Sequence, residues 1–209
     1  MKALLKEHKS KRTEIRNRLW DFKRVYDKRD KEIFSELCFC VLTPQAKAVV
    51  CDAAIKRMEK KGLLLNGSRE DIRACLKGVR FPNNKAGYLV EAREFFRNEK
   101  GIDIKGRLDT KDIFKTREWL VRHIKGFGYK EASHFLRNIG LGKDLAILDR
   151  HILRNLKRYK VISAIPKTLT KKRYLAMENK MRKFFKRVNI PMEEIDLLFW
   201  SKETGKIFK

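Results

Sequence analysis

The sequence predicts an all-α protein, and two patterns support this prediction. Apolar residues recur every three or four positions along most of the 209 residues, which is the spacing that places them on one face of a helix. Sustained alternation of apolar and polar residues, which marks half-buried strands, is absent from the sequence, as are internal repeats.

The helices are predicted in order from their apolar faces and their terminal residues. Residues 2–31 form a charged helix with one apolar face, and residues 33–42 form a short, mostly apolar helix. Thr43 is predicted to cap a third helix, whose first residue is Pro44 and which ends at Gly62. Further helices are predicted at residues 69–76, 83–98, 111–124, 129–139, 149–158, 170–188 and 193–204.

The charge of the chain predicts a polyanionic partner. The chain contains 52 Lys and Arg against 26 Asp and Glu, a formal net charge of +26, and nucleic acid is the commonest partner for such a surface. Residues 1–31 contain 12 basic and 5 acidic side chains, and residues 166–187 contain 9 and 1. The second segment also contains Tyr174, Phe184 and Phe185, and we predict that it faces phosphates. A solvated surface with bound counterions is the alternative.

Other function classes are excluded by composition. A hydrophobic fraction of 43% argues against a disordered tail, and no apolar run reaches the ~18 residues of a membrane span. The first 12 residues are too charged for the core of a signal peptide, so we expect reduced cysteines. The cysteine spacing does not fit paired metal ligands, and we predict core positions for Cys38, Cys40, Cys51 and Cys75.

Two glycines around one hydrophobic residue mark a tight turn between two helices. An apolar helix is predicted to end at Ile124, the residues Gly126-Phe127-Gly128 follow, and the next helix begins at Tyr129. Glycine lets the backbone approach a ligand closely, and a helix N-terminus presents free N–H groups at the positive end of its dipole. The segment is suited to a DNA phosphate, although glycines between helices are also ordinary turn residues.

Lys130 and Asp149 are the candidate catalytic groups. Lys130 falls in the first turn of its helix, where the dipole disfavours a cation, so we predict an amine that gives up its proton and acts as a nucleophile. Burial and the nearby Lys125 or Arg150 would add to this effect. A phosphate-contacting surface lysine is the alternative. Asp149 opens a later helix, and it either caps that helix or takes a proton from the amine.

Residues 124–132 and 148–151 together resemble the helix–hairpin–helix DNA glycosylase superfamily. The resemblance implies that Lys130 marks a bifunctional glycosylase/lyase and that Asp149 is its downstream aspartate. Leu42-Thr-Pro-Gln45-Ala is similar to the loop from which relatives insert an amide side chain into the duplex. Endonuclease III-like relatives carry a four-cysteine iron–sulfur motif near the C-terminus, and since no cysteine follows Cys75, we expect no such cluster.

Residues 36–43, residues 165–169 and the C-terminal Lys209 resemble the type-2 8-oxoguanine DNA glycosylases, and this resemblance spans nearly the whole chain. It implies the helix–hairpin–helix DNA glycosylase fold, which has two helical lobes with a cleft between them. Residues 32–130 would form a helical-barrel lobe that ends in the hairpin. Residues 1–31 and 131–209 would form the second lobe.

The resemblance also implies roles for single residues. Lys130 would attack C1′ of the damaged nucleotide, Asp149 would assist, and β-elimination would then cut the strand. Gln45 would fill the gap left by the flipped base. The base pocket would contain Lys209, Trp200 and Phe81. Further DNA contacts would come from Gly126, Gly128, Lys125, Arg150 and His151, and a monovalent cation would bind the carbonyls of Arg122, Ile124 and Phe127.

The sequence therefore predicts a monomeric enzyme without a cofactor that acts on duplex DNA containing 8-oxoguanine. We expect it in the cytoplasm, associated with the nucleoid and not with a membrane. Three alternatives stay open: a non-catalytic helix–hairpin–helix DNA-binding protein, a basic helical RNA-binding protein, and a glycosylase for an oxidised pyrimidine or a mismatched adenine.

Overall fold

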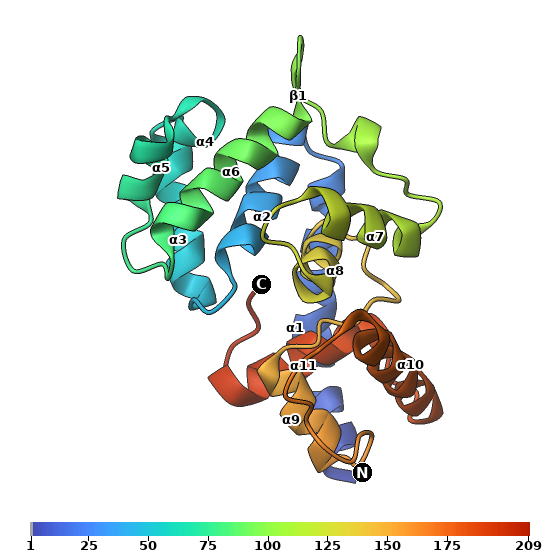
Figure 1. Ribbon diagram of the computed structural model, residues 1–209. Helices are drawn as coiled ribbons and strands as arrows, with labels where there is room; N and C mark the ends of the chain where they lie inside the picture. Colours follow the sequence, from blue (N-terminus) through green and yellow to red (C-terminus); the bar gives the residue numbers. More distant parts are fainter. Residues whose placement is uncertain (1) are drawn as a thin grey trace. The chain divides into compact units, whose positions relative to one another are not determined.

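A computed structural model describes residues 2–209, which form 11 α-helices and one two-stranded sheet (Figure 1). The all-α prediction is confirmed. The chain divides into two compact units. Val25–Phe135 form one, here called the central unit, and the segments before Val25 and from Leu136 to Lys209 form the other, here called the terminal unit. No helix within residues 2–209 is both long and apolar enough to cross a membrane.

The central unit is built around an apolar helix, α2 (Asp30–Leu42), which packs against two other helices, α3 (Ala48–Lys60) and α6 (Pro82–Phe96) (Figure 1). All four cysteines are buried, as predicted. The remaining elements are α4 (Leu63–Asn66), α5 (Arg69–Cys75), the strands β1 (Arg97–Asn98) and β2 (Gly101–Ile102), the 3-10 helix η1 (Lys105–Arg107), α7 (Ile113–His123) and the start of α8 (Tyr129–Asn138).

The terminal unit has a core that draws on both ends of the chain. Leu4 and Ile15 from α1 (Lys2–Tyr26) and Phe199 from α11 (Ile195–Thr204) are buried in it, and α9 (Arg150–Arg158) packs against α11. The other elements are α10 (Lys171–Arg187) and the 3-10 helix η2 (Met192–Glu194). Buried polar pairs supplement the apolar contacts: His8 is hydrogen-bonded to Glu194, and Arg137 Nη2 lies 2.9 Å from Asp196 Oδ2.

One predicted helix start is wrong. The third helix begins at Ala48 and not at Pro44, because Pro44 and Gln45 form a turn in which the Ala46 N–H donates to the Thr43 carbonyl over 3.1 Å. The Thr43 hydroxyl does not cap α3, since it donates to the Cys40 carbonyl at the end of α2. Gln45 has a φ of 55°, which no helix accepts. The first helix is also shorter than predicted, and α4 and the small sheet were not predicted.

Candidate active site

The turn between α7 and α8 is anchored by the phenylalanine between its two glycines. Phe127 is 7% exposed, and its ring centroid lies 6.3 Å from that of Phe135. The Phe127 N–H donates to the Ile124 carbonyl over 3.1 Å, which closes the turn. Gly126 has a φ of 87°, and a Cβ there would lie 2.8 Å from the Tyr88 ring. Both the backbone angle and the neighbouring ring therefore require glycine at position 126.

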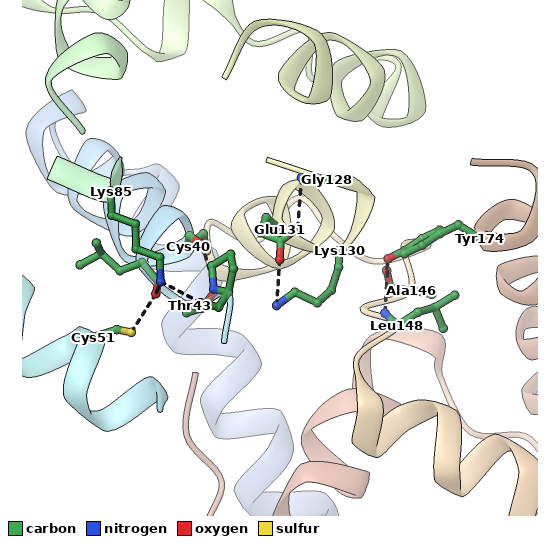
Figure 2. A network of polar contacts seen from close by, with 12 residues as sticks. Cys40, Thr43, Cys51, Lys85, Gly128, Lys130, Glu131, Ala146, Leu148 and Tyr174 are labelled. Carbon is green, nitrogen blue, oxygen red and sulfur yellow. Dashed lines mark hydrogen bonds and ion pairs between the residues drawn. The ribbon is translucent and has the colours of Figure 1, made fainter. Parts of the chain in front are cut away.

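Lys130, the predicted nucleophile, is the second residue of α8, and its ammonium is held by the next residue. Lys130 Nζ lies 3.0 Å from Glu131 Oε1, while Glu131 Oε2 accepts the Gly128 N–H over 3.1 Å (Figure 2). A glutamate at the third helical position that bonds back to the cap N–H is half of a capping box. Glu131 thus satisfies the helix end and supplies a negative charge that offsets the dipole's effect on the ammonium.

Glu131 was not among the predicted site residues, although its place three residues after Gly128 matches the capping pattern. The Lys130 side chain remains 25% exposed and that of Glu131 12%. The amine is therefore partly enclosed and still reachable by a ligand.

Lys85 is a second lysine in the same polar network (Figure 2). Its side chain is almost fully buried in α6, and its Nζ donates to the carbonyls of Leu42 and Pro44 over 2.7 and 2.8 Å. Burial lowers the pKa of Lys85 and the charge of Lys130 adds to this effect, while Cys51 and Glu131 act in the opposite direction. Cys51 Sγ donates to the same Leu42 carbonyl over 3.3 Å, and burial raises the pKa of this thiol to about 11. Cys51 is therefore uncharged at neutral pH and gives Lys85 no counter-ion.

Two predicted DNA-contacting residues of the central unit have unusual backbones. Gln45 is exposed with a φ of 55°, and Phe81 is 47% exposed with a φ of 58°. The Arg80 guanidinium lies 5.0 Å from the centre of the Phe81 ring. Lys125, in the turn before Gly126, pairs with Glu91 over 3.1 Å. The carbonyls proposed for a cation belong to Arg122, Ile124 and Phe127, at the end of α7 and in this turn.

Asp149 lies in the terminal unit, where it caps α9: its Oδ1 accepts the Ile152 N–H over 2.7 Å. The segment before it is held by α10. Glu178 Oε1 accepts the Ala146 N–H over 2.7 Å. The Tyr174 hydroxyl accepts the Leu148 N–H over 3.3 Å while it donates to the Ala146 carbonyl (Figure 2). Two side chains from the basic segment thus hold the backbone of Ala146 and Leu148, which leads to Asp149.

The other predicted residues of the terminal unit lie on α9, α11 and the C-terminal tail. The His151 and Trp200 rings are in edge contact with centroids 6.2 Å apart, and His151 Nδ1 lies 3.5 Å from Glu203 Oε2. Arg150 is exposed, and Lys209 is half-buried. Arg18 Nε donates to the Phe208 carbonyl over 3.1 Å, which ties the tail to α1. Within residues 2–209, no group of three or more His, Cys, Asp or Glu side chains is arranged to hold a metal ion.

Comparison with known proteins places this chain in one family. Residues 15–190 match the family model described as 8-oxoguanine DNA glycosylase. The 8-oxoguanine DNA glycosylase/AP lyase of Fusobacterium nucleatum is 49% identical over 212 residues, which cover 98% of this chain and 95% of that protein. The protein of the same name from Methanocaldococcus jannaschii is 42% identical over 216 residues, with full coverage of both chains at 100%.

Solved structures agree with the sequence matches. The crystal structure of the Methanocaldococcus jannaschii 8-oxoguanine glycosylase/lyase with a 15mer DNA containing 8-oxoguanine superposes with a TM-score of 0.88 at 40% identity, covering 100% of both chains. The 8-oxoguanine DNA glycosylase of Thermotoga maritima gives a TM-score of 0.88 at 37% identity, covering 100% of this chain and 97% of that one. With the glycine turn, the lysine that follows it and the downstream aspartate all present, the chain belongs to the helix–hairpin–helix family of 8-oxoguanine DNA glycosylases.

Proposed function

We propose that Lys130 is the nucleophile of an 8-oxoguanine DNA glycosylase/AP lyase, and that Asp149 assists it. The observation that carries this assignment is the position of Lys130 on α8, directly after the Gly126-Phe127-Gly128 turn, with its ammonium 3.0 Å from a carboxylate and a quarter of its side chain exposed. A lysine that only contacts phosphate would need no partly enclosed carboxylate beside it.

In the first step, the Lys130 nitrogen forms a bond to C1′ as the glycosidic bond breaks, and the base departs with the bonding electrons and receives a proton. The ammonium must lose a proton before attack, and Glu131 Oε1 lies within hydrogen-bonding distance to accept it. The Asp149 carboxylate stabilises the positive charge that develops on the sugar. The amine then loses a further proton, its lone pair forms the C=N bond as the C1′–O4′ bond breaks, and O4′ takes up a proton, which gives a Schiff base. Loss of a C2′ proton then breaks the C3′–O bond; the 3′ phosphate leaves, and the strand is cut.

Recognition has to separate 8-oxoguanine from guanine. The lesion carries an oxygen at C8, and its N7 is an N–H donor where guanine has an acceptor. A pocket acceptor facing N7 leaves guanine with two opposed acceptors, a cost of ~1–3 kcal/mol. We propose that Lys209 takes part in this discrimination, and that Trp200 and Phe81 form the aromatic walls of the pocket. Exposure of the Phe81 ring supports its part in this assignment.

Contacts to the DNA backbone are assigned to the hairpin and to α9. The Gly126 N–H group and the side chains of Lys125, Arg150 and His151 would face phosphates. The Gly128 N–H donates to Glu131 Oε2 over 3.1 Å, so it would have to leave that bond to reach a phosphate. A monovalent cation is assigned to the carbonyls of Arg122, Ile124 and Phe127; in support, the Ile124 oxygen keeps a second lone pair beside its bond to Phe127. When bound, the cation would add positive charge for a phosphate.

We propose that the protein acts as a monomer, in the cytoplasm with the nucleoid DNA, and without an iron–sulfur cluster. The four cysteines support the last point, because they are buried among apolar residues and their spacing does not match paired ligands.

Borohydride trapping on duplex DNA with one 8-oxoguanine tests the catalytic assignment. The unaltered protein should form a covalent adduct and cut the strand, whereas Lys130→Gln should form no adduct, cut nothing and still bind the lesion. Lys115→Gln is the matched control, because this exposed lysine lies on α7, pairs with Asp112 over 3.3 Å and has no assigned DNA contact. Adduct formation by Lys130→Gln would show that another residue is the nucleophile. Parallel duplexes with an oxidised pyrimidine or a mismatched adenine define the lesion.

A further inference from the structure

The loop that carries Gln45 is a strained turn. Thr43 and Ala46 are joined by the hydrogen bond that closes a four-residue turn, with Pro44 second and Gln45 third. Proline in the second position and a positive φ in the third are the features of a type II turn. Glycine or asparagine is favoured in that third position because a Cβ is disfavoured there, and this chain has glutamine. Such a conformation persists only where the surrounding structure holds it.

Lys85 holds the peptide group that defines this turn. Type I and type II turns differ by a flip of the central peptide, which reverses its carbonyl and changes φ of the third residue from negative to positive. The central carbonyl here is that of Pro44, and Lys85 Nζ donates to it over 2.8 Å (Figure 2). The same ammonium donates over 2.7 Å to the carbonyl of Leu42, the last residue of α2. The flipped turn would remove one of these two bonds.

A lysine is a costly residue for this position. Its side chain is 4% exposed, both acceptors are main-chain carbonyls, and Cys51 is a neutral thiol. Burial of an ammonium whose hydrogen-bond partners are carbonyls is unfavourable, and an apolar residue of the same length would fill the space without that penalty. The Glu131 carboxylate also acts on this ammonium, but the pKa of Lys85 is still lowered overall, so the charge offsets only part of the cost. The position at the C-terminus of α2, where the helix dipole favours a cation, offsets part of the cost. The benefit that the lysine provides is the pair of hydrogen bonds that hold the loop to the end of α2.

We propose that Lys85 is a positioning residue, which locks the Pro44–Gln45 peptide so that Gln45 leaves the backbone in the direction required to enter the DNA duplex. This inference rests on the proposed function, in which Gln45 fills the gap left by the flipped base. Lys85 itself touches neither substrate nor reacting atoms in this assignment. It acts through the loop and makes the inserted side chain available before DNA binds.

The test compares one reaction that needs a filled gap with one that does not. Lys85→Met keeps the length of the side chain and removes the ammonium. Its single-turnover excision of 8-oxoguanine from duplex DNA should fall by roughly ten- to a hundredfold, the usual penalty for a misplaced group. Strand cleavage at an abasic site in single-stranded DNA, which also uses Lys130 but has no gap to fill, should stay within about twofold. A 2-aminopurine beside the lesion should report less base flipping.

A double-mutant cycle with Gln45→Ala identifies the route of the effect. If Lys85 acts through Gln45, the double variant should be no slower on duplex DNA than Gln45→Ala alone, because both substitutions remove the same contribution of the Gln45 side chain. Lys60→Met, at an exposed position in the same unit, is the control for loss of a lysine. If Lys85→Met unfolds below the assay temperature, Lys85→Gln, which keeps an amide donor, replaces it. The excision rate of Lys85→Gln on duplex DNA should fall below that of the unaltered protein by less than the loss expected for Lys85→Met.

Three results would overturn the proposal: unchanged duplex excision by Lys85→Met, an equal loss on single-stranded abasic DNA, or losses that multiply in the double variant. The second would indicate that Lys85 acts on Lys130 or on the fold. Absence of cleavage by the unaltered protein on both substrates would instead overturn the proposed function, so the two failures are distinguishable.

Discussion

Replacement of Gly126 by alanine should damage the hairpin by two separable effects. The φ of 87° places position 126 in the left-handed region, where a Cβ costs ~1–2 kcal/mol. The new Cβ would also lie 2.8 Å from Cδ2 of Tyr88, closer than side-chain carbons approach one another. Because this atom belongs to a rigid ring and not to a flexible chain end, the clash adds ~1–3 kcal/mol. The free energy of unfolding should therefore fall by ~2–5 kcal/mol.

Gly62→Ala is the matched control, since Gly62 has a φ of 66° in the same unit and a Cβ there would meet nothing within 4 Å. It should lose only the backbone cost of ~1–2 kcal/mol. Both alanines restrict the unfolded chain to the same extent, so this contribution cancels in the comparison. The difference between the two variants isolates the contact with Tyr88.

Urea unfolding of both variants, with affinity for duplex DNA measured below the unfolding transition, provides the assay. Gly126→Ala should be the less stable and should also bind DNA more weakly, because the displaced turn misplaces the N–H groups assigned to phosphate. Gly62→Ala should keep its DNA affinity. Equal stability of the two variants, together with equal affinity, would refute the argument that Tyr88 and the left-handed backbone fix this turn.

Further predictions concern the terminal unit and the buried thiols. Asp149→Asn should stay within about 0.5 kcal/mol of the parent stability, since asparagine caps helices as well as aspartate does, while single-turnover excision falls by roughly a hundredfold or more. Deletion of Lys209 should reduce the preference for 8-oxoguanine over guanine more than the affinity for undamaged duplex; equal losses would contradict its assignment. Cys51, with its pKa raised by burial to about 11 from 9.0, should be alkylated at pH 8 roughly 100-fold more slowly in the native state than in urea. The Cys51 thiol ionises at lower pH in the unfolded state than in the folded state, so the free energy of unfolding should decline as pH rises from about 9 to about 11. Urea titrations at these pH values measure this decline.

The elements that sequence predicted best are those whose stabilising contacts are local. The helix predicted at residues 129–139 is observed at Tyr129–Asn138, and the predicted cap Asp149 bonds a residue three positions later. The hydrogen bonds that define these elements join residues within one helical turn, so the spacing of residue types along the chain is enough to predict them. The role of Glu131 is equally local and follows from the capping pattern.

Contacts between distant segments explain what the sequence did not predict. Lys85 bonds carbonyls 43 and 41 residues before it, and no local pattern distinguishes it from the other lysines. The error at Pro44 has the same origin. Proline after threonine is a common helix start, and here the bond from Lys85 to the Pro44 carbonyl favours a turn over the first turn of a helix. The tertiary contact therefore overrides the local preference.

The basic segment at residues 166–187 shows that a charge count does not indicate which side chains face outward. That its basic side chains face phosphates stays a prediction. Its aromatic residues Tyr174, Phe184 and Phe185 are buried, whereas none of its nine basic residues is buried, so the aromatic rings belong to the core and do not face phosphates. The lone acid, Glu178, is 2% exposed and accepts the Ala146 N–H. Because Glu178 is buried, the outer face of α10 is more basic than the count of nine basic and one acidic residues implies. Glu178 instead holds the backbone of the segment that leads to Asp149.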